Sequence, residues 1–218
     1  MKNTLLSFFV ITTLLLGSCV ITQEYHFNKD LSGNYKFEMK MGDLINMMQA
    51  MDTTGNFMSS MDTLDASFEE IKQNYKNAGA KNINVGWKDD KTTIFISFDF
   101  TDTDNLNSVL ENSRSGLSSS MLSGISGDPG KFTHRGKRKI SFDFPEFNKD
   151  TTSFKDIASM KDYISFETVF SFDRKIKSFN NENAKLSEDK NSITFSGKLD
   201  DIINKDYTLD TDIKLKIK

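Results

Sequence analysis

The chain is poor in the residue types that usually build a disulfide-stapled domain or a catalytic centre. Its 218 residues include one cysteine, two histidines, two prolines and one tryptophan. A single cysteine excludes an intramolecular disulfide, so a domain with this sequence is held together by its core. Scarce proline beside 19 phenylalanines is typical of strands. The net charge of −3 gives no sign of a nucleic-acid partner.

The motifs of known enzyme and metal-site classes are also missing. His26 and His134 stand far apart, and no H-x-x-x-H, C-x-x-C, G-x-S-x-G, P-loop or G-x-G-x-x-G pattern occurs. Acidic residues cluster at 99–105 and 210–212, but neither cluster has the central glycine and distal glutamate of an EF-hand loop. We therefore expect no cofactor, no metal and no catalytic residue, and interpret the acidic clusters as caps and solvated strand edges.

One enzymatic alternative stays open. A glycan-acting hydrolase needs two carboxylates about 5–9.5 Å apart across a cleft. Such a pair would come from the aspartates around the predicted strand ends, which are Asp99, Asp102, Asp104 and Asp143. Two of these carboxylates facing each other across a cleft would support a hydrolase, whereas a flat, filled sheet face would not.

The first 19 residues have the pattern of a lipoprotein export signal. One positive charge, Lys2, precedes an interrupted apolar run from Leu5 to Leu16, which is too short for a membrane span. The run ends in Leu16-Gly17-Ser18-Cys19, which resembles the lipobox of bacterial lipoproteins. The resemblance implies that residues 1–18 are a signal peptide and that Cys19 begins the mature chain with diacylglyceryl and palmitate chains. The alternative is an ordinary secretory signal with an incidental cysteine.

Lipidation predicts where the protein resides. Two or more acyl chains anchor a protein stably to a bilayer. Only residues 20–24 separate Cys19 from the first predicted strand, so the domain is expected close to its membrane. Those residues lack the acidic cluster that resembles a surface-export signal, which favours the periplasmic side of the cell envelope. The membrane is thus the expected partner, with a lipid or an envelope protein as a further one.

Period-two alternation predicts an α+β fold for residues 19–218. Apolar residues alternate with charged ones along 35–41, 94–100 and 213–217, and Ile-Ser-Phe-Asp-Phe occurs twice, at 96–100 and 140–144. We expect a single domain whose seven to nine strands form a largely antiparallel β-sheet of hairpins, with three or four helices packed on one face. A Ser/Gly-rich segment at 113–130 is predicted to be a mobile loop.

Turn-forming and helix-capping residues predict where individual elements begin and end. Residues 30–33 are predicted to be a hairpin turn in which Gly33 takes positive φ. Asp62 to Ala78 is predicted to be a helix with a buried stripe that includes Phe68, Ile71 and Tyr75, ending at Gly79. Asp102 or Thr103 is expected to cap a short helix, and a hairpin is expected to turn at Arg135-Gly136.

Two groups of side chains are candidates for binding. A methionine-rich group could line a pliant apolar pocket, or simply fill the core: Met39, Met41, Met47, Met48 and Met51. The densest basic run could contact anionic lipid headgroups, or be a solvated hairpin tip that blunts edge pairing: Arg135, Lys137, Arg138 and Lys139.

Two segments carry a family resemblance. The Leu31-Ser32-Gly33 turn of the first hairpin, and the stretch from Ile176 to Ile202, resemble the bacterial LppM-type lipoprotein domain. The chain departs from that family at Phe195, where a tryptophan is usual. The resemblance implies an envelope-facing α+β domain, sometimes tied to lipid binding, with no catalytic residues. It adds to the interpretation of a non-enzymatic, membrane-anchored lipoprotein that binds a lipid or partner protein or has a structural role.

Overall fold

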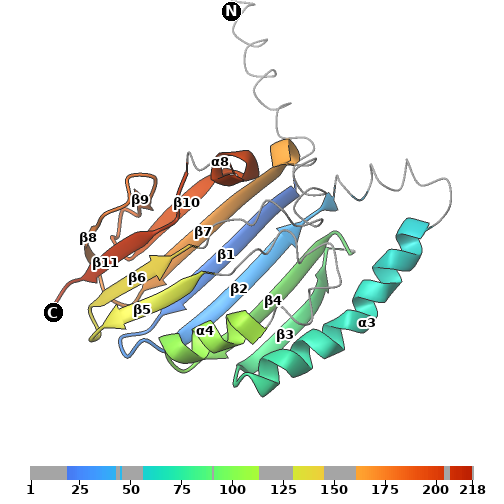
Figure 1. The fold of residues 1–218 in the computed structure, drawn as a ribbon, viewed down its shortest axis with the longest axis horizontal. Coiled ribbons are helices and arrows are strands. Elements are labelled where there is room, and N and C mark those ends of the chain that lie inside the picture. Colours follow the sequence, from blue (N-terminus) through green and yellow to red (C-terminus); the bar gives the residue numbers. More distant parts are fainter. Residues whose placement is uncertain are drawn as a thin grey trace, which may run out of the picture.

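A computed structural model describes residues 19–42, 45, 56–89, 91–112, 130–144, 161–203 and 207–217. In these segments eleven strands form two sheets (Figure 1). The large sheet has the order β3-β4-β2-β1-β7-β10-β9, with β1 Cys19–Phe27, β2 Gly33–Lys40, β3 Lys81–Lys88, β4 Thr93–Phe100, β7 Ile164–Phe172, β9 Lys185–Leu186 and β10 Ser192–Lys198. The small sheet has the order β5-β6-β11-β8, with β5 Lys131–Arg135, β6 Lys139–Asp143, β8 Ile176–Phe179 and β11 Thr211–Leu215.

The large sheet is amphipathic because successive side chains alternate between its faces. The inner face carries the aromatic and aliphatic residues of each long strand, such as Tyr25 and Phe27 in β1. The small sheet lies over this face. Phe132 of β5 is 5.0 Å from Tyr25 and 5.3 Å from Phe27 between ring centroids, and Phe142 of β6 is 5.0 Å from Phe170 of β7. These rings form the centre of the core.

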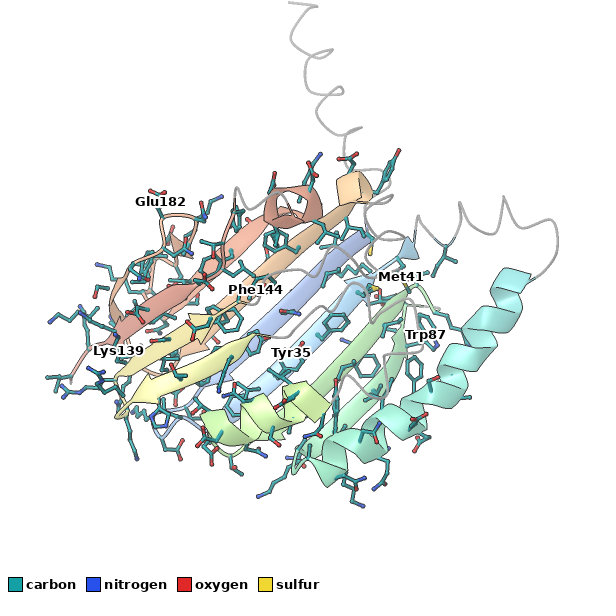
Figure 2. All side chains as sticks on the ribbon, viewed as in Figure 1. Tyr35, Met41, Trp87, Lys139, Phe144 and Glu182 are labelled. Carbon is teal, nitrogen blue, oxygen red and sulfur yellow. The ribbon has the colours of Figure 1, made fainter. Side chains whose placement is uncertain are left out.

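Helices cover the inner face beyond the small sheet. Helix α3, Asn56–Asn77, packs against the β3–β4 hairpin, near Trp87 (Figure 2). The rings of Phe68 and Trp87 lie 5.7 Å apart. Helix α4, Thr103–Asn112, is capped by Asp102, whose Oδ1 accepts the N–H of Asn105 at 2.8 Å. The remaining elements are the short α8, Leu199–Ile203, and the 3₁₀-helix η2, Lys161–Tyr163.

The predicted architecture is wrong. In place of a single, largely antiparallel sheet with three or four helices packed on one face, the described chain is mostly β and forms two sheets. The small sheet occupies part of the inner face that the prediction gave to helices, and β1 pairs with β7 in parallel. The physical reason is that alternation identifies a strand with one buried face. It does not show which strand is the pairing partner or which sheet the strand joins.

Several local predictions are confirmed. The hairpins β1–β2, β3–β4 and β5–β6 are antiparallel pairs, and the last of these turns at residues 136–138. Phe68, Ile71 and Tyr75 are buried, and Gly79 ends α3 with φ +91°. Helix α3 begins at Asn56 instead of Asp62.

One turn prediction is wrong. Gly33 does not adopt positive φ; Leu31, with φ 74°, is the residue of the β1–β2 turn in the left-handed region. Gly33 is required for a different reason, since a Cβ there would lie 1.7 Å from the carbonyl oxygen of His26. The predicted signal peptide, residues 1–18, and residues 113–129 of the predicted mobile loop lie outside the described residues.

Candidate anion-binding site

A hollow of about 760 Å³ opens at the end of the molecule where β1 finishes and β2 begins. We call it the basic hollow. Four separate segments contribute to it: the β1–β2 turn, the β5–β6 turn, the β7–β8 connection and the chain that follows β11. Its lining consists of Lys29, Lys137, Arg138, Asp173, Arg174, Lys175, Lys216 and Ile217. Six of these eight side chains are cationic and one is anionic, in a protein whose net charge is −3.

Hydrogen bonds to backbone carbonyls hold the four segments together, and at the end of β1 the N–H of Asp173 donates to the carbonyl of Phe27 at 3.0 Å. The Arg174 guanidinium donates to the carbonyl oxygen of Lys137 at 2.8 Å, which ties the β7–β8 connection to the β5–β6 turn. The N–H of Leu215 donates to the carbonyl of Arg138, and that of Lys216 to the carbonyl of Lys175, each at 2.8 Å. None of these hydrogen bonds uses a lysine side chain, so the lysine ammonium groups remain available for a ligand.

The cations of the basic hollow are not neutralised by neighbouring acids. Among the described residues, no carboxylate lies within ion-pairing distance of any of the six. Asp30 is close by, and its pKa is held below the usual range first by the Ser32 hydroxyl, which donates at 2.7 Å, and to a smaller extent by the charge of Lys137. Unpaired like charges around one concavity attract an anion.

The single carboxylate of the lining faces a histidine. Asp173 Oδ1 lies 3.4 Å from His26 Nε2, and Ser171 Oγ lies 3.0 Å from His26 Nδ1. These residues resemble a catalytic triad in composition. However, Ser171 is the cross-strand partner of His26 on the outer face of the large sheet, and its hydroxyl also donates to the Tyr25 carbonyl at 3.3 Å. The group therefore links β1, β7 and the rim of the basic hollow.

An apolar side chain stands beside the cations. Ile217 is 74% exposed, which makes it one of the large hydrophobic residues that the described chain leaves in solvent. The alternation in the sequence had predicted a strand through residue 217, but β11 ends at Leu215. Ile217 therefore lies two residues beyond the end of β11, just after the Lys216 N–H that donates to the carbonyl of Lys175. This residue was missed by sequence analysis because alternation treats it as one more inward position.

The structure places two of the four predicted headgroup contacts in the basic hollow and two outside it. Lys137 and Arg138 line the basic hollow, whereas Arg135 is the last residue of β5 and is exposed outside the lining. Lys139 also lies outside the lining and forms an ion pair with Asp212 at 3.0 Å. The other four cations, Lys29, Arg174, Lys175 and Lys216, come from segments that the sequence did not single out.

The predicted apolar pocket falls partly outside the described chain. Met39 and Met41 are buried in the hydrophobic core, with 1% and 6% of their surface exposed. Met39 pairs across the large sheet with Ile21 of β1 and Ile94 of β4. Met47, Met48 and Met51 lie outside the described residues.

The candidate carboxylates for hydrolysis have local roles. Asp99 accepts a hydrogen bond from Asn82 at 2.6 Å, and Asp102 caps α4. Asp104 lies in the first turn of α4, and Asp143 is exposed at the end of β6. Within the described segments no group of three or more His, Cys, Asp or Glu side chains is placed to hold a metal ion.

Cys19 is the first residue of β1, at the end of the strand opposite the basic hollow. It pairs in register with Ile164 of β7, and its thiol is buried on the inner face with 3% of the residue exposed. Burial raises the pKa of the thiol to about 11. None of the helices in the described part of the chain is both long and apolar enough to cross a bilayer.

No protein-family model and no curated protein matches the chain. Among solved structures, the chain is similar to the NMR structure of the folded domain of LppM from Mycobacterium tuberculosis. The identity is 9% and the TM-score 0.43, over 94% of each chain. This is a weak likeness to the lipoprotein type that the first hairpin and residues 176–202 resemble in sequence. At that TM-score it transfers neither a site nor a function to this chain.

Proposed function

We propose that the protein is a non-enzymatic lipoprotein of the bacterial cell envelope that binds a phosphate-bearing anion in the basic hollow. The observation that carries the proposal is the convergence of six cations from four segments on one concavity, with Asp173 as its single acid. Lysine and arginine form the strongest hydrogen bonds to phosphate oxygens, because both partners are charged. A bound phosphate group would also relieve the mutual repulsion of the cations.

The anchor in this proposal is a lipid on Cys19, as the lipobox implies, on the periplasmic side of its membrane. Cys19 is the first residue of β1, so its side chain can leave the core by opening one terminal pair with Ile164. Terminal residues of a strand fray at low free-energy cost. A thioether-linked lipid then extends from the end of the large sheet without disturbing its centre.

Binding is favoured over catalysis because the acids near the basic hollow already have partners. Asp30 accepts hydrogen bonds from Ser32, and Asp173 lies against His26. A general acid or base has to be within reach of the reacting group and free to exchange a proton. The cations around the hollow bind and orient an anion but do not supply a nucleophile.

The test is calorimetric titration of the full-length, detergent-solubilised lipoprotein with inorganic pyrophosphate. The expected result is saturable binding that weakens as salt is added. Lys137→Glu combined with Lys216→Glu should weaken binding about tenfold or more, since both charge-assisted contacts are lost.

The matched control is Lys81→Glu combined with Lys185→Glu, two exposed lysines on β3 and β9 that change the net charge equally. This control should keep the wild-type affinity. Equal weakening in both double variants would show that only overall charge matters, and the proposal of a site would be wrong.

A further inference from the structure

The lipid anchor and the basic hollow lie at opposite ends of the same strand. β1 runs from Cys19 to Phe27, and Lys29 of the basic hollow follows it in the next turn. Nine residues of extended chain span about 27 Å. In Figure 2, Lys139, which follows Arg138 of the lining, lies at one end of the molecule, and Met41, which follows β2, lies toward the other. The cations are therefore not beside the site of lipidation.

The connection between anchor and domain is too short to reorient the molecule freely. Cys19 is both the expected first residue of the mature chain and the first residue of β1, so no spacer separates lipid from sheet. Tyr163 lies at this same end, because it precedes Ile164, the partner of Cys19, and it is 61% exposed. Exposed tyrosine is favoured at membrane–water interfaces. Both features orient the Cys19 end toward the anchoring bilayer and the basic hollow away from it.

The exposed face of the basic hollow has the chemistry of a peripheral membrane contact. Six cations surround it, and Ile217, 74% exposed, extends beside Lys216. Lysine or arginine near an anionic bilayer gains attraction to several headgroups at once. An apolar side chain amid such cations can insert at the headgroup boundary. A site for a small soluble anion would gain nothing from Ile217.

We propose that the basic hollow docks onto an anionic membrane surface that faces the anchoring one, so that the protein contacts one bilayer through Cys19 and a second through its basic end. This inference rests on the proposed anion-binding function and adds the source of the phosphate, which is lipid headgroups presented in trans. Charge complementarity supplies the attraction, and Ile217 supplies the preference for a bilayer over a free anion.

The experiment reconstitutes the full-length lipoprotein, lipidated at Cys19, in uncharged phosphatidylcholine vesicles. Fluorescent acceptor vesicles contain phosphatidylglycerol with phosphatidylcholine, or phosphatidylcholine alone. Co-sedimentation measures the capture of acceptors by the protein-bearing vesicles. We expect capture of the anionic acceptors only, and competition by inorganic pyrophosphate.

Variants separate the contributions of charge and insertion. Lys137→Glu with Lys216→Glu should reduce capture about 30-fold or more, while Lys81→Glu with Lys185→Glu should leave it unchanged. Ile217→Ser should reduce capture about tenfold, because one apolar side chain no longer inserts. The fluorescence of Trp87, the single tryptophan, reports whether each variant is folded.

Three results would overturn the inference. If pyrophosphate binds but no anionic acceptor is captured, the anion site stands and the membrane contact is wrong. If Ile217→Ser captures vesicles as well as the wild type, the apolar contact is wrong and headgroup charge alone accounts for capture. If neither pyrophosphate nor vesicles bind, the proposed function fails together with the inference.

Discussion

Gly33 marks the closest backbone approach in the first hairpin. A Cβ at this position would lie 1.7 Å from the carbonyl oxygen of His26 and 2.7 Å from the Phe100 ring. The carbonyl is held in the β1–β2 ladder and the ring in the core, so neither neighbour can move without breaking other contacts. The absence of a side chain at residue 33 therefore allows the β1–β2 turn to form next to the basic hollow.

We predict that Gly33→Ala destabilises the protein by about 3 kcal/mol, which is the upper range for overpacking. Gly42→Ala is the matched control, since its nearest neighbour would be Thr92 Cβ at an ordinary 3.7 Å. Urea unfolding followed by Trp87 fluorescence measures both. Equal stability of the two variants would show that the turn adapts easily and that the close approach is not a constraint.

At the residue scale, the sequence predicted where a glycine was needed but not why. The run Asp30-Leu31-Ser32-Gly33 identified the turn, and the turn is there. The positive φ falls on Leu31, because Gly33 already pairs with Phe27 as the first residue of β2. Propensity gives glycine to the left-handed region by default. The steric collision with His26 depends on the tertiary structure, and residue propensities contain no information about it.

Asp65 joins two elements of the large sheet's edge. From helix α3 it accepts hydrogen bonds from the Trp87 indole N–H on β3 and from Lys91 in the β3–β4 turn, the latter at 2.6 Å. The Lys91 hydrogen bond is the main cause of a lowered pKa for Asp65, and the Trp87 bond contributes further. The folded state therefore favours the ionised carboxylate more than the unfolded chain does.

We predict that Asp65→Asn lowers the free energy of unfolding by up to about 1 kcal/mol at neutral pH, a small value because 39% of the carboxylate side chain is exposed. A lowered folded-state pKa stabilises the protein fully above the unfolded value of 3.8, and this stabilisation is lost as pH falls through the folded pKa. The difference between wild type and variant should thus shrink below about pH 4 in acid titrations followed by Trp87 emission. A difference that is constant down to low pH would contradict the ion pair.

At the element scale, the pairing of strands within hairpins was predictable from the sequence, but the division of strands between two sheets was not. The two copies of Ile-Ser-Phe-Asp-Phe are both strands, yet 96–100 lies in β4 of the large sheet and 140–144 begins in β6 of the small one. Each has Ile and Phe buried on one face, as alternation requires. Hairpin partners lie close in sequence, so turns reveal them. The parallel pairing of β1 with β7 joins segments more than a hundred residues apart, and no local pattern encodes it.

The basic hollow exists only at the scale of the whole molecule. Sequence analysis identified the basic run at 135–139, of which Lys137 and Arg138 line the hollow. The other four cations, Lys29, Arg174, Lys175 and Lys216, come from three other segments, in none of which the sequence shows a basic run. Two sheets that place their turns at the same end bring these charges together. Recognising such a site requires the topology, which the sequence alone left undetermined.

Lipidation is tested most directly through the single cysteine. Because the chain has no other thiol, the thiol content of the denatured protein counts the molecules whose Cys19 is unmodified. We predict almost no reactive thiol in denatured protein extracted from bacterial membranes, since the lipid occupies the sulfur. Residues 19–218 made without the signal segment should titrate one thiol per chain when denatured.

The native form of that unlipidated chain adds a second, structural expectation. Its thiol is buried at the start of β1 with a pKa raised to about 11, so it is protonated at neutral pH and shielded from an alkylating reagent. Native alkylation should therefore be much slower than alkylation in denaturant. A full thiol in the membrane-extracted protein would mean that Cys19 is not the anchor. The two-membrane contact would then lose its first point of attachment, while pyrophosphate binding at the basic hollow, at the other end of β1, would be unaffected.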